Sequence, residues 1–174
     1  CQTSGAIPGE AQLIELCWAR FRADGSVDPR ALEPSGGPCS LVEGRRLPRR
    51  IAMLTGLDAG TLAAAPPPKL RLESLLSDVS ADTTGPLVLA HAASFERRWL
   101  RAEHPPAEAW RWLCTLEIAR RLLPGLPRRG LRALSGYLGH VLPSDRRQAP
   151  AHVRATCAVW SALVARLADE AEVH

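Results

Sequence analysis

Residues that could transfer protons stand at two places in the sequence. His91 and Glu96 follow the apolar run Leu87–Leu89, and His152 lies five residues before Cys157. In α/β proteins, side chains at the carboxyl end of a strand commonly form a site, which favours His91 and Glu96. A histidine in the first turn of a helix is more often a cap or a surface group, and a cysteine in an apolar stripe is mostly core. Spacing alone therefore identifies no reaction.

Two further features of the sequence stand out. Thr3-Ser4-Gly5 forms a turn of small residues, and pairs of arginines recur along the chain. The planar guanidinium of arginine suits phosphate, although such pairs are usually solvated surface. Lys and Arg total 22 against 18 Asp and Glu, a net charge of +4, which permits an anionic partner without requiring one.

The elements that must position these residues begin as strands and continue as helices. Ile14, Leu16 and Trp18 alternate, which predicts a strand within 11–22, and Leu87–Leu89 predicts a buried strand. A Gly- and Pro-rich stretch over 24–39 predicts a loop, followed by a short strand over 40–42. This order indicates an α/β protein. Apolar spacing and Pro or Gly boundaries predict the helices. The first spans 45–54 and ends at Gly56, a short helical turn capped by Asp58 follows, and the next helix spans 69–80. Later helices are expected from Ala93, over 109–123, over 130–141 and from Pro150 onward.

Composition limits the class of protein. The chain has 174 residues, 46% hydrophobic and 23% charged, which fits one folded domain over 1–174 and argues against disorder. No apolar run approaches the length of a transmembrane helix, so no membrane is expected. Five cysteines without a CxxC pair predict no disulfide framework and no zinc ribbon, and favour a reducing cytoplasm.

Five groups of residues then follow one another in a characteristic order. They are Cys1–Gly5 (CQTSG) with Leu13–Leu16 (LIEL), Ile51–Leu57 (IAMLTGL), Ala90–Leu100 (AHAASFERRWL), Cys114–Pro124 (CTLEIARRLLP) and His152–Ala158 (HVRATCA). In this order the chain resembles the DEDDh 3′–5′ exonucleases, the family of the proofreading epsilon subunit of bacterial DNA polymerase III. The resemblance implies a ribonuclease-H-like fold, with a mixed central sheet flanked by helices. It also implies that the first strand, near the centre of that sheet, is largely missing from this chain.

The resemblance also implies where a site would lie. In that family four carboxylates hold two divalent metals, and a histidine acts as general base on the attacking water. The metal-ligand positions fall on Gln2, Glu96 and Cys157, the general-base position falls on His152, and the first aspartate would fall one residue before Cys1. A neutral amide and a mostly protonated thiol are poor ligands for magnesium, which prefers anionic oxygen.

The sequence therefore predicts a pseudo-exonuclease that keeps the fold and has lost or severely weakened two-metal catalysis. No cofactor is expected, or Mg²⁺ or Mn²⁺ if residual activity exists. Two alternatives stay open: a weak but active 3′–5′ exonuclease on single-stranded nucleic acid, and a soft-metal or redox site at His152 and Cys157.

The family groove implies a nucleic-acid interface. The expected partner is the 3′ end of single-stranded DNA or RNA, or else a protein partner or a fused domain. Arg97, Arg98, Arg128 and Arg129 could reach phosphates, with plain surface charge as an equal alternative. The residues carried over from the family groove are Thr3, Ser4 and Gly5 under the terminal nucleotide, Leu54 and Thr55 beside its base, His91, and Phe95 near the second base.

Overall fold

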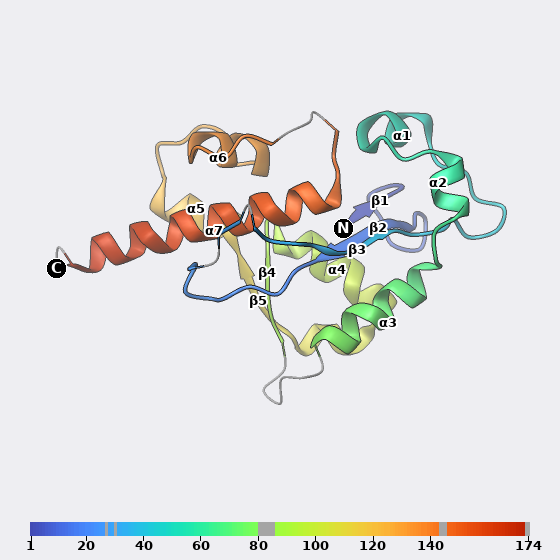
Figure 1. Ribbon diagram of the computed structural model, residues 1–174, viewed down its shortest axis with the longest axis horizontal. Helices are drawn as coiled ribbons and strands as arrows, with labels where there is room; N and C mark the ends of the chain where they lie inside the picture. Colours follow the sequence, from blue (N-terminus) through green and yellow to red (C-terminus); the bar gives the residue numbers. More distant parts are fainter. Residues whose placement is uncertain (27, 30, 80–85, 143–145, 173–174) are drawn as a thin grey trace.

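The strands form two separate sheets in the computed structural model, which describes residues 1–26, 28–29, 31–79, 86–142 and 146–172. Strands β1 (Gln2–Thr3), β2 (Leu13–Trp18) and β3 (Ser35–Pro38) pair antiparallel in the order β1-β2-β3. Strands β4 (Leu87–Ala90) and β5 (Arg111–Cys114) pair in parallel. The protein thus combines antiparallel and parallel pairing in one mixed α/β architecture (Figure 1).

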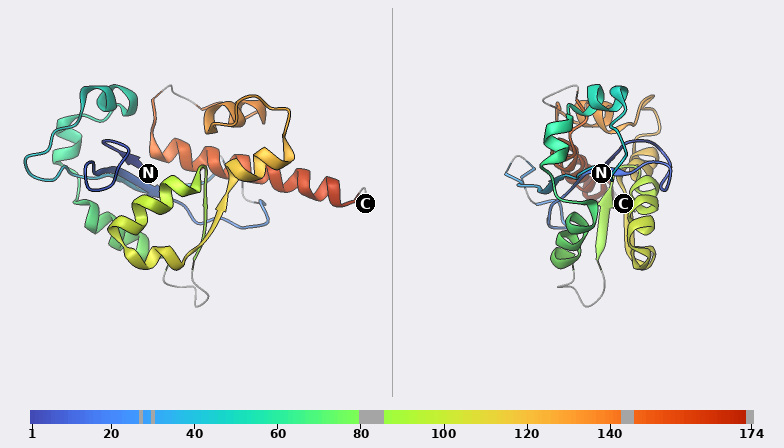
Figure 2. Two further views of the ribbon diagram at one scale, coloured as in Figure 1. Left: turned by 180° about the vertical axis from the view of Figure 1, so that it is seen from behind. Right: turned by 90° about the vertical axis from the view of Figure 1, so that its right-hand side faces the viewer.

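Helices surround both sheets, and the last one organises the molecule. Helix α7 extends from the middle of the molecule, where its first turns lie near β2, to one end, where its C-terminal turns project away from the other elements (Figures 1 and 2). The helices are α1 (Arg49–Thr55), α2 (Ala59–Ala63), α3 (Pro68–Val79), α4 (Ala93–Glu103), the 3₁₀ helix η1 (Pro105–Ala109), α5 (Thr115–Leu122), α6 (Leu131–Tyr137) and α7 (Ala149–Glu172).

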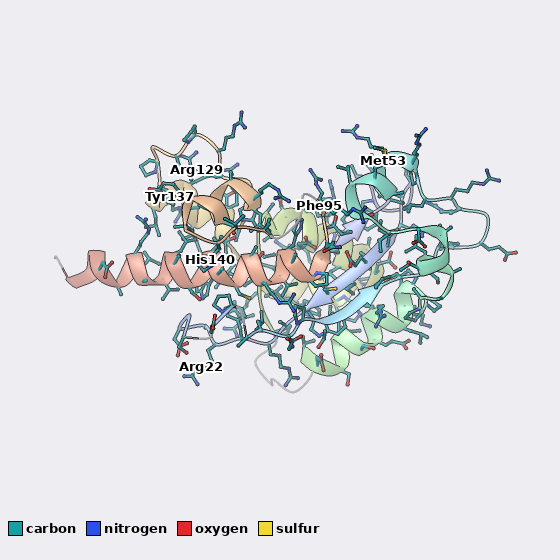
Figure 3. The ribbon with its side chains drawn as sticks, turned by 45° about the horizontal axis from the view of Figure 1, so that its top comes forward. Arg22, Met53, Phe95, Arg129, Tyr137 and His140 are labelled. Carbon is teal, nitrogen blue, oxygen red and sulfur yellow. The ribbon has the colours of Figure 1, made fainter. Side chains whose placement is uncertain are left out.

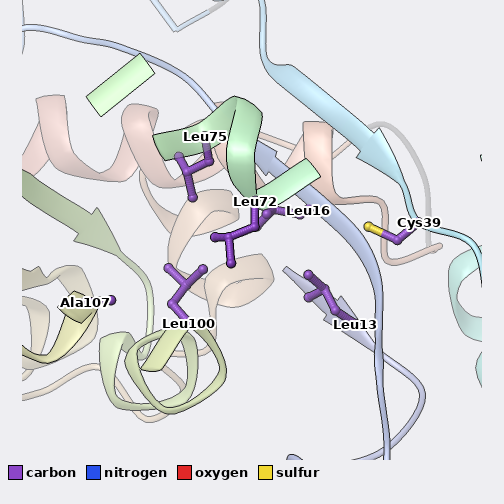
Figure 4. Packing of buried hydrophobic residues seen from close by; sticks show 7 residues of the cluster. All are labelled: Leu13, Leu16, Cys39, Leu72, Leu75, Leu100 and Ala107. Carbon is purple, nitrogen blue, oxygen red and sulfur yellow. The ribbon is translucent and has the colours of Figure 1, made fainter. Parts of the chain in front are cut away.

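Two apolar clusters hold these layers together. In the first, Leu72 and Leu75 of α3 point toward Leu100 of α4, beside Leu13 and Leu16 of β2 (Figure 4). The second joins α5, α6 and the middle of α7. Its buried members are Ala119, Leu123, Leu134, Val159 and Leu163. Burial of apolar surface thus fixes α7 through its middle turns, and its first turn is left to polar contacts.

The Gly- and Pro-rich stretch contains a strand, contrary to the loop predicted there. β3 spans Ser35–Pro38, and the strand predicted over 40–42 is irregular backbone. Gly36 has φ +90°, and a Cβ there would come within 2.6 Å of the Trp18 ring. Glycine therefore lets β3 approach β2 beneath the tryptophan, where no side chain would fit.

The helix predicted over 109–123 starts late. Residues Arg111–Cys114 form β5 and pair with Leu87–Ala90, and only from Thr115 does the chain become helical. Apolar residues over four positions fit either period, and the hydrogen bonds to β4 decide for a strand. β4 is also less buried than predicted, because Leu87 is 43% exposed.

Several helix ends agree with the sequence. α1 ends at Thr55, and Gly56 follows in the left-handed conformation with φ 76°. The Asp58 carboxylate accepts a hydrogen bond from the Thr61 N–H at 2.7 Å and caps α2. α7 begins at Ala149, one residue before Pro150.

Candidate functional site

The first turn of α7 is held by three polar contacts from distant parts of the chain. Glu15 Oε2 of β2 accepts a hydrogen bond from the Ala149 N–H at 2.8 Å. The Arg147 N–H donates to the Leu54 carbonyl at the end of α1 at 2.6 Å. Gln2 Nε2 of β1 lies 3.3 Å from His152 Nδ1. The start of α7 is thus the point where β1, β2 and α1 meet.

Glu96 reaches the same place from α4. The chain leaves β4, passes Ala92 in the left-handed conformation with φ 59°, and begins α4 with Glu96 in its first turn. Glu96 Oε2 lies 2.8 Å from the α-amino nitrogen of Cys1, which places the carboxylate next to Gln2. Glu96, His152 and Cys157 all line one cavity of about 860 Å³, and Gln2 contacts His152. Three of the four positions implied by the resemblance therefore line one cavity, and the fourth, Gln2, contacts one of them, His152.

The surroundings of His152 set the state of its ring. Burial, followed by the positive charges of the Cys1 α-amino group, Arg147 and Arg132, lowers the pKa of His152 to about 4, against the opposite effect of Glu96. The ring is therefore neutral near pH 7. The Gln2 amide nitrogen, which only donates, faces Nδ1, and this contact assigns the acceptor role to Nδ1 and the ring proton to Nε2.

Burial also changes the pKa of two further groups at the site, Cys157 and Glu15. It raises the pKa of the Cys157 thiol to about 11, so the sulfur stays protonated at neutral pH. It raises the pKa of Glu15 as well, although the hydrogen bond from Ala149 partly offsets this effect. Glu15 is only 6% exposed, and its carboxylate stabilises the N-terminus of α7 by accepting the hydrogen bond from Ala149.

These residues do not fit a two-metal centre. Glu96 contributes one carboxylate, Gln2 one neutral amide and Cys157 a protonated thiol, whereas a pair of Mg²⁺ ions needs several anionic oxygens. Across the described residues, no group of three or more His, Cys, Asp or Glu side chains is arranged to hold a metal ion. The described residues also contain no such group that includes His152 and Cys157, the pair named in the soft-metal alternative.

The predicted turn under a terminal nucleotide is a compact loop. The Thr3 hydroxyl donates to the Gly5 carbonyl at 2.6 Å, and the Ser4 hydroxyl accepts from the Gln12 N–H at 3.0 Å. Ser4 and Gly5 line a second hollow of about 620 Å³ together with Arg45 and Arg46. Two arginine side chains therefore lie beside the turn, a neighbourhood that the sequence alone did not predict.

Leu54 and Thr55 lie at the end of α1. Thr55 is 4% exposed, and its hydroxyl donates to the Ile51 carbonyl and accepts from the Leu57 N–H. Its side chain therefore stabilises the helix end and is turned away from solvent. Leu54 is half-buried, and its carbonyl accepts the hydrogen bond from the backbone N–H of Arg147.

His91 and Phe95 occupy different surroundings. His91 lines the cavity, its Nδ1 lies 2.9 Å from the Thr115 hydroxyl, and its buried Nε2 has no hydrogen-bond partner among the described residues. Burial lowers the pKa of His91 as well. Phe95 is half-buried on α4, with the Arg98 guanidinium 5.7 Å from its ring centre (Figure 3).

Three of the four arginines expected at phosphates have partners within the protein. Arg97 pairs with Glu108 at 2.5 Å, Arg98 donates to the Ala6 carbonyl and Arg129 donates to the Leu123 carbonyl. Arg128 is exposed. The cations that act on His152 are instead Arg132 and Arg147.

Sequence reasoning missed three contributors to the site, Glu15, Arg132 and Arg147. The sequence does mark Glu15 as a candidate, because it is an acidic residue inside the apolar strand segment Leu13–Leu16. Arg147 belongs to one of the arginine pairs, which looked like solvated surface.

Comparison with known proteins finds a related architecture. Neither a family model nor a curated protein matches the chain. Among solved structures, it is similar to exonuclease X in complex with 5′ overhanging duplex DNA, with a TM-score of 0.63 and 20% sequence identity. The match covers 98% of this chain and 89% of that one.

The chain has an exonuclease fold of the ribonuclease-H-like type. This likeness concerns the fold alone, and it confirms the mixed α/β architecture predicted from the sequence.

Within the described part of the chain, no helix combines the length and apolar character needed to cross a membrane.

Proposed function

We propose that this chain is a catalytically degenerate exonuclease-fold domain that binds the 3′ end of single-stranded DNA or RNA without cleaving it. The contact between Gln2 and His152 carries the proposal. An amide occupies Nδ1 of the ring at 3.3 Å, and the proton on Nε2 makes that nitrogen a donor rather than a base. In this tautomer the ring has no free nitrogen to activate water.

The donor set supports the same proposal. Gln2 offers a neutral amide and Cys157 a protonated thiol, so Glu96 supplies the one carboxylate among these three positions. Divalent ions such as Mg²⁺ prefer several anionic oxygens, so this donor set disfavours them at the hollow.

Binding of nucleic acid is supported by the turn at Thr3–Gly5 and the adjoining hollow. Arg45 and Arg46 line that hollow beside Ser4 and Gly5, and the Arg45 guanidinium also donates to the Gly9 and Glu10 carbonyls. A phosphate could therefore meet Arg46, the remaining N–H groups of Arg45 and the backbone of the turn. The similar solved structure is of an exonuclease bound to duplex DNA, which is a property of that protein and makes the test on this one worthwhile.

Fluorescence anisotropy tests the binding. We expect a short 5′-labelled oligothymidylate to bind equally well with Mg²⁺ and with EDTA, and to lose about tenfold or more in affinity between ~50 and ~200 mM salt. The Arg45→Gln/Arg46→Gln variant should weaken binding, and Arg120→Gln/Arg121→Gln is the matched control. Affinity that ignores salt would instead favour a protein partner.

The alternative is a weak exonuclease dependent on Mg²⁺ or Mn²⁺. One observation favours it: Glu96 keeps its carboxylate close to a neutral His152. A labelled oligonucleotide incubated with Mn²⁺ separates the two functions. Cleavage that persists through purification and disappears in the His152→Ala variant would establish the alternative and reject the proposal.

A further inference from the structure

Two arginines approach His152 from separate elements. Arg132 is the second residue of α6, directly after Leu131, which lines the cavity of about 860 Å³. Arg147 lies just before α7, two residues ahead of Ala149. Burial contributes most to the low pKa of His152, and both guanidinium groups lower it further, so both lie close enough to act on the ring. We call the part of the cavity beside this ring the His152 hollow.

The fold fixes the backbone of both arginines. α6 packs on the middle of α7 in the second apolar cluster (Figure 1). The Arg147 N–H donates to the Leu54 carbonyl at 2.6 Å. The neighbouring Arg146 lies against Gly56, where a Cβ would be 2.7 Å from Arg146 Cδ. Because the backbone is already held, a ligand that meets these side chains costs little ordering of the chain.

The charges around the His152 hollow suit an anion. Since Gln2 faces Nδ1 of the ring, the ring offers the N–H of Nε2 as a donor. Arg132 and Arg147 add two positive charges with exposed side chains, and the carboxylate of Glu96 opposes them. Guanidinium groups bind phosphate oxygens through charge-assisted hydrogen bonds, which are stronger than hydrogen bonds between neutral groups. A phosphate group would therefore find both charge and a donor here.

We propose that the His152 hollow binds a terminal phosphate monoester, so that this chain takes 3′-phosphorylated ends of nucleic acid in preference to 3′-hydroxyl ends. The Nε2–H of His152 donates to the phosphate, and Arg132 and Arg147 neutralise its charge. A phosphate monoester carries a charge of about −1.5 to −2 near pH 7, whereas a hydroxyl carries none. The proposal rests on the proposed function and names the chemical form of the end that this site takes.

Three 5′-labelled oligothymidylates separate the effect of the end from that of total charge. The first ends in a 3′-phosphate, and the second is its 3′-hydroxyl counterpart. The third has a 3′-hydroxyl and is one nucleotide longer, so it carries as many phosphate groups as the first. In EDTA near neutral pH, we expect the first to bind about tenfold more tightly than the other two. Equal affinities of the first and third would overturn this inference and leave the proposed function standing, whereas no binding of any of them would reject both.

Paired substitutions locate the preference. Arg132→Gln/Arg147→Gln should abolish it, and because both side chains are exposed the fold should survive. Arg45→Gln/Arg46→Gln should weaken all three oligonucleotides alike and keep the preference. Glu96→Gln removes the opposing carboxylate and should increase it. A preference that survives in Arg132→Gln/Arg147→Gln and disappears in Arg45→Gln/Arg46→Gln would place the terminal phosphate in the other hollow and overturn the proposal.

NMR reports on the contact with the ring itself. The Cε1–H resonance of His152 should shift on saturation with the 3′-phosphorylated oligonucleotide, and shift less with its 3′-hydroxyl counterpart. A resonance that neither oligonucleotide moves would show that the terminal phosphate does not reach His152, and would overturn the proposal even if the affinities differ.

Discussion

Glu15 Oε2 and the backbone N–H of Ala149 are joined by a 2.8 Å hydrogen bond across 134 residues of sequence. This bond connects the middle strand of the antiparallel sheet to the start of the longest helix. Because His152 lies one turn further along α7, the same bond fixes where the imidazole stands relative to Gln2. Glu15 therefore acts as a positioning residue for the candidate site.

Two substitutions of Glu15 test whether its acceptor oxygen stabilises the start of α7. Glu15→Ala leaves the buried Ala149 N–H without its acceptor and should lower the free energy of unfolding by about 2 kcal/mol. Glu15→Gln keeps an oxygen acceptor and should cost less than about 1 kcal/mol. Urea denaturation at neutral pH measures both changes. Equal losses for the two variants would contradict the role of the acceptor oxygen.

The same pair of proteins should differ in pH dependence. Burial raises the pKa of Glu15 above its ordinary value of 4.5, so the folded state binds a proton that the unfolded state releases. The contribution of Glu15 to stability is therefore fully present below pH 4.5 and is lost as pH rises through the folded pKa. Relative to Glu15→Gln, the parent protein should gain stability as pH falls toward 4.5. A constant difference would contradict the raised pKa.

His152 should titrate far below an ordinary histidine. Its pKa of about 4 lies below the ordinary value of 6.5, so between these values the unfolded state binds a proton that the folded state does not. Its contribution to stability is therefore present above pH 6.5 and is lost as pH falls toward 4. Relative to His152→Asn, the parent protein should lose about 1 kcal/mol over this range, after discount for solvent screening.

NMR measures the same value directly. The Cε1–H resonance of His152, assigned through its absence in His152→Asn, should not shift between about pH 8 and pH 5.5. A midpoint near 6.5 would show that the ring is solvated and that Gln2 does not hold it.

The sequence predicts those parts of the fold whose signals are local. The end of α1 at Gly56 and the cap of α2 at Asp58 follow from single residues. β3 and β5 could not be predicted from local residues, because each becomes a strand through hydrogen bonds to a neighbour: β3 pairs with β2, and β5 pairs with β4. The partner of Glu15 is a backbone N–H, so no residue type in the sequence marks it.

Gly36 should tolerate no side chain. A Cβ there would overlap the Leu16 carbonyl and lie 2.6 Å from the Trp18 ring, on a backbone with φ +90°. Gly36→Ala should therefore lower the free energy of unfolding by about 2–4 kcal/mol. Gly44→Ala is the matched control, because Gly44 also has positive φ but no atom within 4 Å, and it should cost about 1 kcal/mol. Equal costs would mean that β3 does not lie beneath Trp18.

Restoring acidic groups should create a metal site if Gln2 and Cys157 converge with Glu96 on one hollow. In Gln2→Glu/Cys157→Asp, three carboxylates would face the cavity that His152 lines. We expect Mn²⁺ to bind this variant at least about tenfold more tightly than the parent in calorimetry, and to raise its Tm. The variant Gln2→Glu/Cys157→Asn keeps the shape without the second charge and should bind less.

The pKa of His152 gives this last prediction a readout independent of metal. Two new negative charges beside the ring should stabilise its protonated form and raise the pKa well above about 4 in the metal-free variant. Because burial of the carboxylate introduced by Cys157→Asp could itself weaken the fold, the titration is made on protein whose far-UV spectrum matches the parent. A folded variant with unchanged Mn²⁺ affinity and an unchanged histidine pKa would show that the three positions do not share one hollow.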